Sequence, residues 1–172
     1  MQSFKFICVL AFMLATSQAS YAESVNPFKA IGIDNPEEVK TFILSLQKNI
    51  KENNIEGISD KIVYPLVVRD YDSKVVLNGI SDLKEYYNRI FNDDVKSAIL
   101  CQKYSELGAQ WRGIMVGRGT LWITLRFLKN ESKFDDEKYS DLTDRSLWKI
   151  SITQINYSDI TKAFVEGCKK NK

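Results

Sequence analysis

The sequence contains no histidine, and this absence removes the commonest general base and a principal zinc ligand from any site. A serine nucleophile would lack the imidazole that usually activates it, and no G-x-S-x-G motif is present. Cysteine is also scarce: one of the three, Cys8, lies in the apolar amino-terminal run, and the other two without histidine do not complete a zinc site. We expect no catalytic residue set, no metal and no other cofactor.

Neither sign of charge dominates, because 24 lysines and arginines stand against 22 aspartates and glutamates. A nearly neutral chain gives no electrostatic reason to bind nucleic acid or an anionic membrane. Long apolar runs are absent too. The longest, FICVLAFMLA at residues 6–15, is about half the length that a helix needs to cross a bilayer. We therefore expect no nucleic-acid partner and no stable membrane anchor.

The amino-terminal segment, residues 1–22, has the pattern of a secretory signal peptide. Lys5 supplies a positive charge, the apolar run follows, and TSQASYA ends in small residues. Cleavage after Ala22 fits the small-residue rule, and cleavage after Ala19 fits it nearly as well. The pattern predicts a periplasmic or secreted protein whose mature part, residues 23–172, forms a single domain.

Cys101 and Cys168 are the cysteines that remain after the predicted cleavage. An exported chain meets oxidising conditions, and an even number of cysteines favours a disulfide between them. The bond would close a long loop, for which the chain-entropy model gives about 4 kcal/mol of stabilisation. Two buried free thiols are the alternative.

Helical spacing predicts a first helix over residues 36–52. Asp34 and Asn35 offer a capping side chain, Pro36 suits the first turn, and acidic residues follow near the positive end of the helix. The apolar positions recur every three or four residues: Val39, Phe42, Ile43, Leu46 and Ile50. A turn and a short second helix are expected directly afterwards.

Three more helices are predicted further along the chain. Ser81 is expected to cap a helix that runs to Phe91, and a third piece covers residues 93–102. A closing helix begins at Ser158. Its apolar side chains are spaced to pack against the domain: Ile160, Phe164 and Cys168.

Alternating and β-branched runs predict the strands. Residues 62–79 have the pattern of a hairpin, and Pro65 places its strand at an edge or at a bulge because proline has no amide donor. A strand is expected over residues 109–116, another over residues 120–128, and a last one over residues 147–156. The charged segment 129–145 is expected to be a solvated loop.

The glycines of WRGIMVGRGTLWI, which are Gly113, Gly117 and Gly119, have two interpretations. A phosphate loop requires its glycines between a strand and a helix, and the residues that follow Gly119 predict a strand instead. We therefore expect a tight reversal or a bulge after Val116. Gly113, inside its predicted strand, indicates a sharp bend or a close approach of backbone.

Four stretches of this pattern resemble the NTF2-like superfamily, and in particular its small exported bacterial members: residues 64–66, residues 80–91, GIMVGRGTLWI and KISITQIN. The resemblance covers residues 35–156. It implies an α+β fold in which a strongly curved antiparallel sheet wraps a long N-terminal helix to form a cone with a pocket. The closing helix is an addition to that pattern.

Aromatic and basic residues on the predicted long strands are the candidate ligand-binding residues: Trp111, Arg112, Trp122, Arg126 and Trp148. Aromatic walls with one or two polar groups are typical of small-molecule pockets. The alternative is that these rings fill the core or its edge. Trp122 and Arg126 share a strand face and could instead contact a partner protein.

The superfamily includes isomerases, dehydratases and polyketide cyclases beside many members that only bind, so the fold leaves the function open. The paired carboxylates lie in predicted turns, helix starts or the solvated loop: Asp70, Asp72, Asp93, Asp94, Asp135 and Asp136. Our first hypothesis is a non-enzymatic binding protein for a small apolar ligand or a partner protein, by analogy an inhibitor or immunity protein. The second is an isomerase, dehydratase or hydrolase with a carboxylate in the cone.

Overall fold

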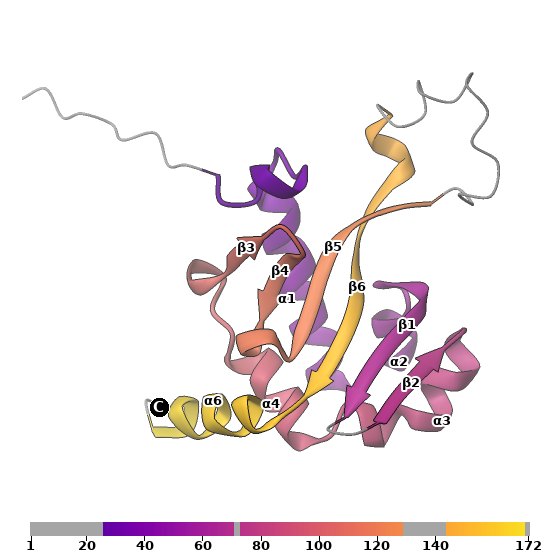
Figure 1. Cartoon of the computed structure of the whole chain (residues 1–172), viewed down its shortest axis with the longest axis vertical. Coiled ribbons are helices and arrows are strands. Elements are labelled where there is room, and N and C mark those ends of the chain that lie inside the picture. Colours follow the sequence, from indigo (N-terminus) through magenta and orange to yellow (C-terminus); the bar gives the residue numbers. More distant parts are fainter. Residues whose placement is uncertain (1–25, 71–72, 129–143, 171–172) are drawn as a thin grey trace, which may run out of the picture.

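The computed structural model describes residues 26–70, 73–128 and 144–170 (Figure 1). The predicted signal peptide and most of the predicted solvated loop lie outside these residues. One six-stranded sheet occupies the centre, with the strand order β2-β1-β6-β5-β4-β3. The strands are β1 (Ile62–Asp70), β2 (Ser73–Leu77), β3 (Gly108–Gln110), β4 (Gly113–Val116), β5 (Leu121–Phe127) and β6 (Trp148–Tyr157).

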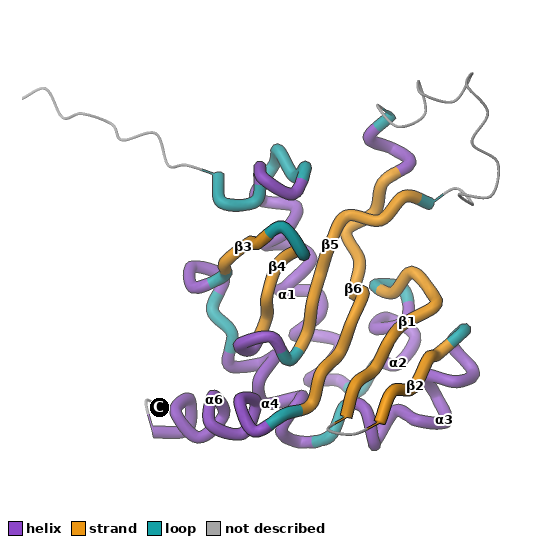
Figure 2. Tube along the Cα trace, viewed as in Figure 1, coloured by secondary structure: helices purple, strands orange, loops and turns teal. Residues whose placement is uncertain are grey.

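In the view of Figure 2, helices lie behind the sheet and along one end of it, so the fold is α+β. The α-helices are α1 (Pro36–Glu52), α2 (Ile55–Ser59), α3 (Ile80–Ile90), α4 (Asp93–Cys101) and α6 (Asp159–Lys170). The described residues also form short 3-10 turns: η1 (Lys29–Ile31), η2 (Tyr104–Glu106), η3 (Gly117–Gly119) and η5 (Arg145–Leu147). Helix α6 follows β6 directly and lies across one end of the sheet.

The prediction of a purely antiparallel sheet is wrong at one pair of strands. The pairs β1–β2, β3–β4, β4–β5 and β5–β6 are antiparallel, whereas β1 and β6 are parallel, so the sheet is mixed. Parallel neighbours need a long crossover between them. Here the crossover from β1 to β6 includes α3, α4 and the strands β3, β4 and β5. The alternation of apolar and polar residues within a strand does not reveal such a long connection.

Strand β1 is an interior strand, although Pro65 lies within it. Its register against β6 shifts between Ile62 and Val67, which is the segment that contains the proline. The predicted bulge is therefore confirmed, and the alternative edge position is not adopted. Where the register shifts, the regular pattern of hydrogen bonds between the strands is interrupted, so no amide donor is required at the proline.

Helix α1 forms as predicted, with the same first and last residues. The Asn35 side chain accepts a hydrogen bond from the Glu37 amide, at 3.1 Å, and caps the first turn. Asn53 ends the helix in the left-handed conformation. One face of the helix is buried: Val39, Ile43, Leu46 and Ile50.

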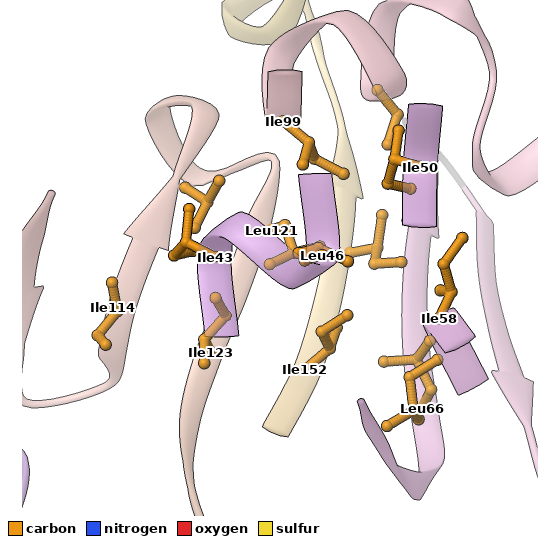
Figure 3. Close-up of a cluster of buried hydrophobic side chains, with 14 of the residues drawn as sticks. Ile43, Leu46, Ile50, Ile58, Leu66, Ile99, Ile114, Leu121, Ile123 and Ile152 are labelled. Carbon is orange, nitrogen blue, oxygen red and sulfur yellow. The ribbon is translucent and has the colours of Figure 1, made fainter. Parts of the chain in front are cut away.

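This buried face packs against the sheet and forms the main core (Figure 3). The strand side of the core consists mainly of branched aliphatic side chains: Leu66, Ile114, Leu121, Ile123 and Ile152. Alternation along β5 agrees with the prediction, since Leu121 and Ile123 are buried and Arg126 is exposed. The space between α1 and the sheet is thus occupied by side chains.

The structure corrects the predicted cap of α3 and identifies the cap of α4. Helix α3 begins at Ile80 with Gly79 as its N-cap, so Ser81 lies inside the first turn. The carboxylate of Asp82 accepts a hydrogen bond from the Asn78 amide at 2.7 Å and holds the chain entering the helix. Helix α4 is capped by Asn92, whose side chain accepts from the Val95 amide, so Asp93 and Asp94 lie in the first turn.

The single strand predicted over residues 109–116 is a hairpin in the structure. Strand β3 ends at Gln110, Trp111 and Arg112 form the turn, and Gln110 pairs with Gly113 at the start of β4. Gly113 has φ +127°, and a Cβ built there would lie 2.3 Å from the carbonyl oxygen of Ile123. The predicted close approach of backbone is therefore confirmed, and it occurs where the hairpin re-enters the sheet.

Candidate functional site

A partly open groove lies at the end of the sheet and has a volume of about 670 Å³. Its walls come from the carboxyl end of α4, from η2 and η3, and from one face of α6. We call it the α4–α6 groove. Ligand pockets in proteins typically have volumes of about 300–1,000 Å³, so a small organic molecule would fit.

The face of α6 that lines this groove is the one predicted to pack into the core. Thr161 and Val165 are the buried residues of the helix, at 1% and 2% exposure, whereas Ile160 is 61% exposed. The helical spacing correctly predicted that Ile160 and Phe164 share one face of α6, but it wrongly predicted that this face packs into the core. The apolar stripe of Ile160 and Phe164, with Cys168, therefore faces the groove.

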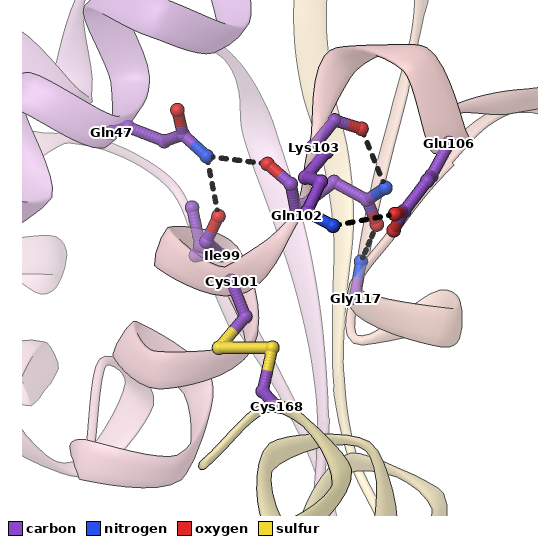
Figure 4. The surroundings of a disulfide bond; sticks show 8 residues. All are labelled: Gln47, Ile99, Cys101, Gln102, Lys103, Glu106, Gly117 and Cys168. Carbon is purple, nitrogen blue, oxygen red and sulfur yellow. Dashed lines mark hydrogen bonds and ion pairs between the residues drawn. A yellow bond between two sulfur atoms is a disulfide. The ribbon is translucent and has the colours of Figure 1, made fainter. Parts of the chain in front are cut away.

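The predicted disulfide is present between Cys101 and Cys168 and joins the end of α4 to α6 (Figure 4). Both cysteines also line the groove. The structure thus has the predicted bond in place of two free thiols. The bond spans 67 residues of sequence and fixes the two helical walls relative to each other.

Two glutamines complete the other side of the groove, and neither was predicted as functional. The Gln47 amide of α1 donates to the carbonyl oxygens of Ile99 and Gln102, at 2.9 and 2.8 Å. Gln47 thus adds a side-chain donor at the carbonyl end of α4, where the Ile99 carbonyl also accepts from the Gln102 backbone amide at 3.3 Å. The buried side chain of Gln102 in turn accepts a hydrogen bond from the Gly117 amide at 2.9 Å (Figure 4).

The turn η3 is therefore tied to α4, and further contacts tie it to α6 and β6. The Thr120 hydroxyl donates to the Gly117 carbonyl at 2.7 Å and lies 3.0 Å from the Thr161 hydroxyl of α6. The Asn156 side chain donates to the Gly119 carbonyl at 2.9 Å. A Cβ at Gly117 would lie 2.9 Å from the Cβ of Ala98, so a glycine permits this close packing on α4.

Arg118 is the one residue of η3 with a side chain, and its backbone is left-handed with φ 58° and ψ 33°. This conformation costs an L-residue other than glycine about 1–2 kcal/mol. The guanidinium is exposed, lines the groove, and forms no hydrogen bond or ion pair with any described residue. Backbone strain of this kind concentrates at functional sites.

The other charges at the groove neutralise each other. Lys103 and Glu106 both line it and form an ion pair at 3.2 Å between Nζ and Oε1. Since no other charged side chain lines the groove among the described residues, Arg118 leaves it with one unbalanced positive charge.

The structure does not bring the five predicted ligand-binding residues together. Trp111 is 86% exposed in the β3–β4 turn, where the Arg112 guanidinium stacks over its ring at 5.3 Å. Trp122 is half-buried on β5, opposite Met115 and Gln154. Arg126 lies further along β5, opposite Lys149, and none of the five lines the α4–α6 groove.

Trp148 instead lines a second, more open depression of about 540 Å³ beside α1. Its ring contacts Phe127 with the centroids 5.1 Å apart. Lys61 also lines this depression, and its ammonium lies 4.9 Å from the centre of the Phe42 ring. Burial lowers the pKa of Lys61 below the usual lysine value, and the nearby charge of Lys149 lowers it further.

The buried polar side chains of the described ranges are few and uncharged. The buried polar residues there are Gln102, Thr120, Ser151 and Thr161, so no described carboxylate is buried. Within the same residues, no group of three or more histidine, cysteine, aspartate or glutamate side chains is placed to hold a metal ion. No helix in the described part of the chain has the length and apolar character needed to cross a membrane.

Comparison with known proteins adds no further assignment, because no protein family, curated protein or solved structure matches the chain. The site therefore stands on its own geometry. Sequence reasoning found the disulfide and the apolar stripe of α6, but it missed Gln47, Gln102 and Arg118. The signal for Arg118 was present in its two flanking glycines, which indicate positive φ across the whole turn.

Proposed function

We propose that this protein is an exported, NTF2-like binding protein and that the α4–α6 groove holds a small, largely apolar ligand. The observation that carries the proposal is the groove itself, in which exposed Leu100 and Ile160 and half-buried Phe164 line a volume suited to a small molecule. A few fixed polar groups, such as Gln102, lie beside the apolar ones.

Two features support export and fold type. A disulfide is compatible with an oxidising compartment, as the predicted signal peptide requires. The packing of α1 on one face of the sheet, and the hairpin followed by two helices and the remaining strands, support the NTF2-like part of the proposal. The filled space between α1 and the sheet favours a ligand site elsewhere on the domain.

A variant that fills the groove tests the proposal directly. Gly167 lines the groove on α6, and a Cβ added there meets no atom within 4 Å. Gly167→Trp should therefore occupy the groove without disturbing the core, and Gly167→Ala is its matched control. Nile red, a neutral apolar dye, serves as the probe for the processed, oxidised protein.

We expect saturable Nile red fluorescence with the natural protein and with Gly167→Ala, and its loss with Gly167→Trp. Circular dichroism checks that the tryptophan variant is folded. Equal binding by both variants, or no saturable binding by the natural protein, would contradict the proposal.

A further inference from the structure

Arg118 distinguishes the α4–α6 groove from a purely apolar surface. Its guanidinium is the unbalanced charge among the described groove residues, because Lys103 is paired with Glu106. Its backbone is also left-handed, a conformation that is unfavourable for residues with a side chain such as arginine. Glycine would hold the same turn without strain, so the turn alone does not explain an arginine.

The strain is maintained by contacts on every side of the turn. Gln102 binds the Gly117 amide, Thr120 binds the Gly117 carbonyl, and Asn156 binds the Gly119 carbonyl. These bonds fix the backbone from which the Arg118 side chain projects. The side chain itself is left exposed at the groove and has no hydrogen-bond partner among the described residues. A fixed base with an unpaired guanidinium is suited to bind an anion.

The apolar side chains of the same groove define the rest of the ligand. Leu100 and Ile160 are 42% and 61% exposed, and Phe164 is half-buried beside them. Exposed aliphatic and aromatic groups gain free energy when an alkyl chain removes them from water. A ligand that is complementary to this groove therefore has both an apolar part and an anionic group.

We infer that the α4–α6 groove binds an amphiphile with a single anionic head, a carboxylate or a phosphate, which Arg118 recognises while the alkyl part lies along α6. This inference rests on the proposed function and adds the ligand class to it. Arg118 acts by direct contact with the head group. Gln102 and Thr120 act by holding the turn.

Calorimetric titration of the processed, oxidised protein tests separately whether the groove binds an alkyl chain and whether Arg118 recognises an anionic head. The probes are decanoate, decyl phosphate, decanol and decyltrimethylammonium, which share one alkyl chain and differ in the head. We expect the two anions to bind about tenfold more tightly than decanol, which corresponds to one charge-assisted hydrogen bond. The cation should bind most weakly.

Arg118→Gln should remove the preference for the anions and leave decanol binding unchanged. Arg69→Gln is the matched control, because Arg69 is an exposed arginine on β1 that does not line the groove. A preference for decanoate without one for decyl phosphate, or the reverse, would identify the head as carboxylate or phosphate and would support the inference.

The outcomes that contradict the inference differ from those that contradict the proposed function. Equal binding of decanol and both anions, abolished by Gly167→Trp, would overturn the anionic head and keep the groove as a binding site. An anion preference that survives in Arg118→Gln would overturn the role of Arg118. Absence of binding by all four probes would overturn both proposals.

Discussion

The core between α1 and the sheet and the groove between α4 and α6 are built from the same kinds of side chain but used differently. Leu46 in the core is fully buried, whereas Leu100 in the groove is 42% exposed. The core is closed by packing on both sides, while the groove walls are held by one disulfide and a few hydrogen bonds. Apolar character alone therefore does not reveal which surface stabilises the fold and which is available to a ligand.

Removal of the disulfide should produce the largest effect and should act mainly on the groove. We expect Cys101→Ser with Cys168→Ser to lower the free energy of unfolding by about 4 kcal/mol, because the unfolded chain regains its loop entropy. Urea denaturation measures the loss, and the natural protein in reductant is the control.

Hydrogen exchange locates this effect. In the double variant, amides of α6 should exchange faster than those of α1, since Thr161 and Val165 are the buried residues described in α6, whereas α1 has four. Equal acceleration in both helices would show that the core and the groove wall unfold together.

A matched pair of leucine truncations compares the two regions directly. Leu46→Ala should cost about 3 kcal/mol, because it leaves a cavity in the filled core. Leu100→Ala should change the stability by less than about 1 kcal/mol and should weaken Nile red binding. Denaturant titration and dye binding provide the two measurements. Similar losses of stability would mean that the groove belongs to the structural core.

Replacing the strained arginine should separate stability from binding. Arg118→Gly relieves the left-handed backbone, while the added freedom of the unfolded chain offsets part of the gain. We expect a net stabilisation of about 0.5–1 kcal/mol by thermal denaturation, together with loss of the preference for decanoate over decanol. A less stable Arg118→Gly protein would show that the side chain has a structural role.

The smallest expected effect concerns Gly167 in α6. An alanine there should stabilise the protein by about 0.5–1 kcal/mol, since glycine is unfavourable inside a helix and the added Cβ meets no neighbour. Thermal denaturation measures the gain. Destabilisation by Gly167→Ala would indicate that this face of α6 is less open than the groove geometry requires.

Local sequence signals predicted most of the individual elements. The proline and acidic residues placed the start of α1, the β-branched runs placed β1 and β2, and the glycines marked both reversals around β4. The errors occurred where the sequence of one segment was compatible with two different local structures. Residues 109–116 had continuous strand character, and only the pairing of Gln110 with Gly113 divided them into a hairpin.

The candidate site was less predictable than the fold. The tryptophans were the natural candidates, yet they lie on separate parts of the molecule, because a side chain's type does not fix its neighbours. Gln47 and Gln102 are ordinary polar residues in the sequence. They become site residues because the end of α4 needs hydrogen-bond partners where it meets α1 and η3.

The sequence by itself determined the period of each helix and the reversal after Val116, and it favoured the pairing of the only two cysteines outside the amino-terminal segment, because these depend on local geometry and on count. The tertiary structure alone decided that β1 and β6 are parallel and that the Ile160 and Phe164 side of α6 faces a groove instead of the core. Both outcomes depend on which distant surfaces meet, and a helical or strand period specifies an apolar face without specifying its partner.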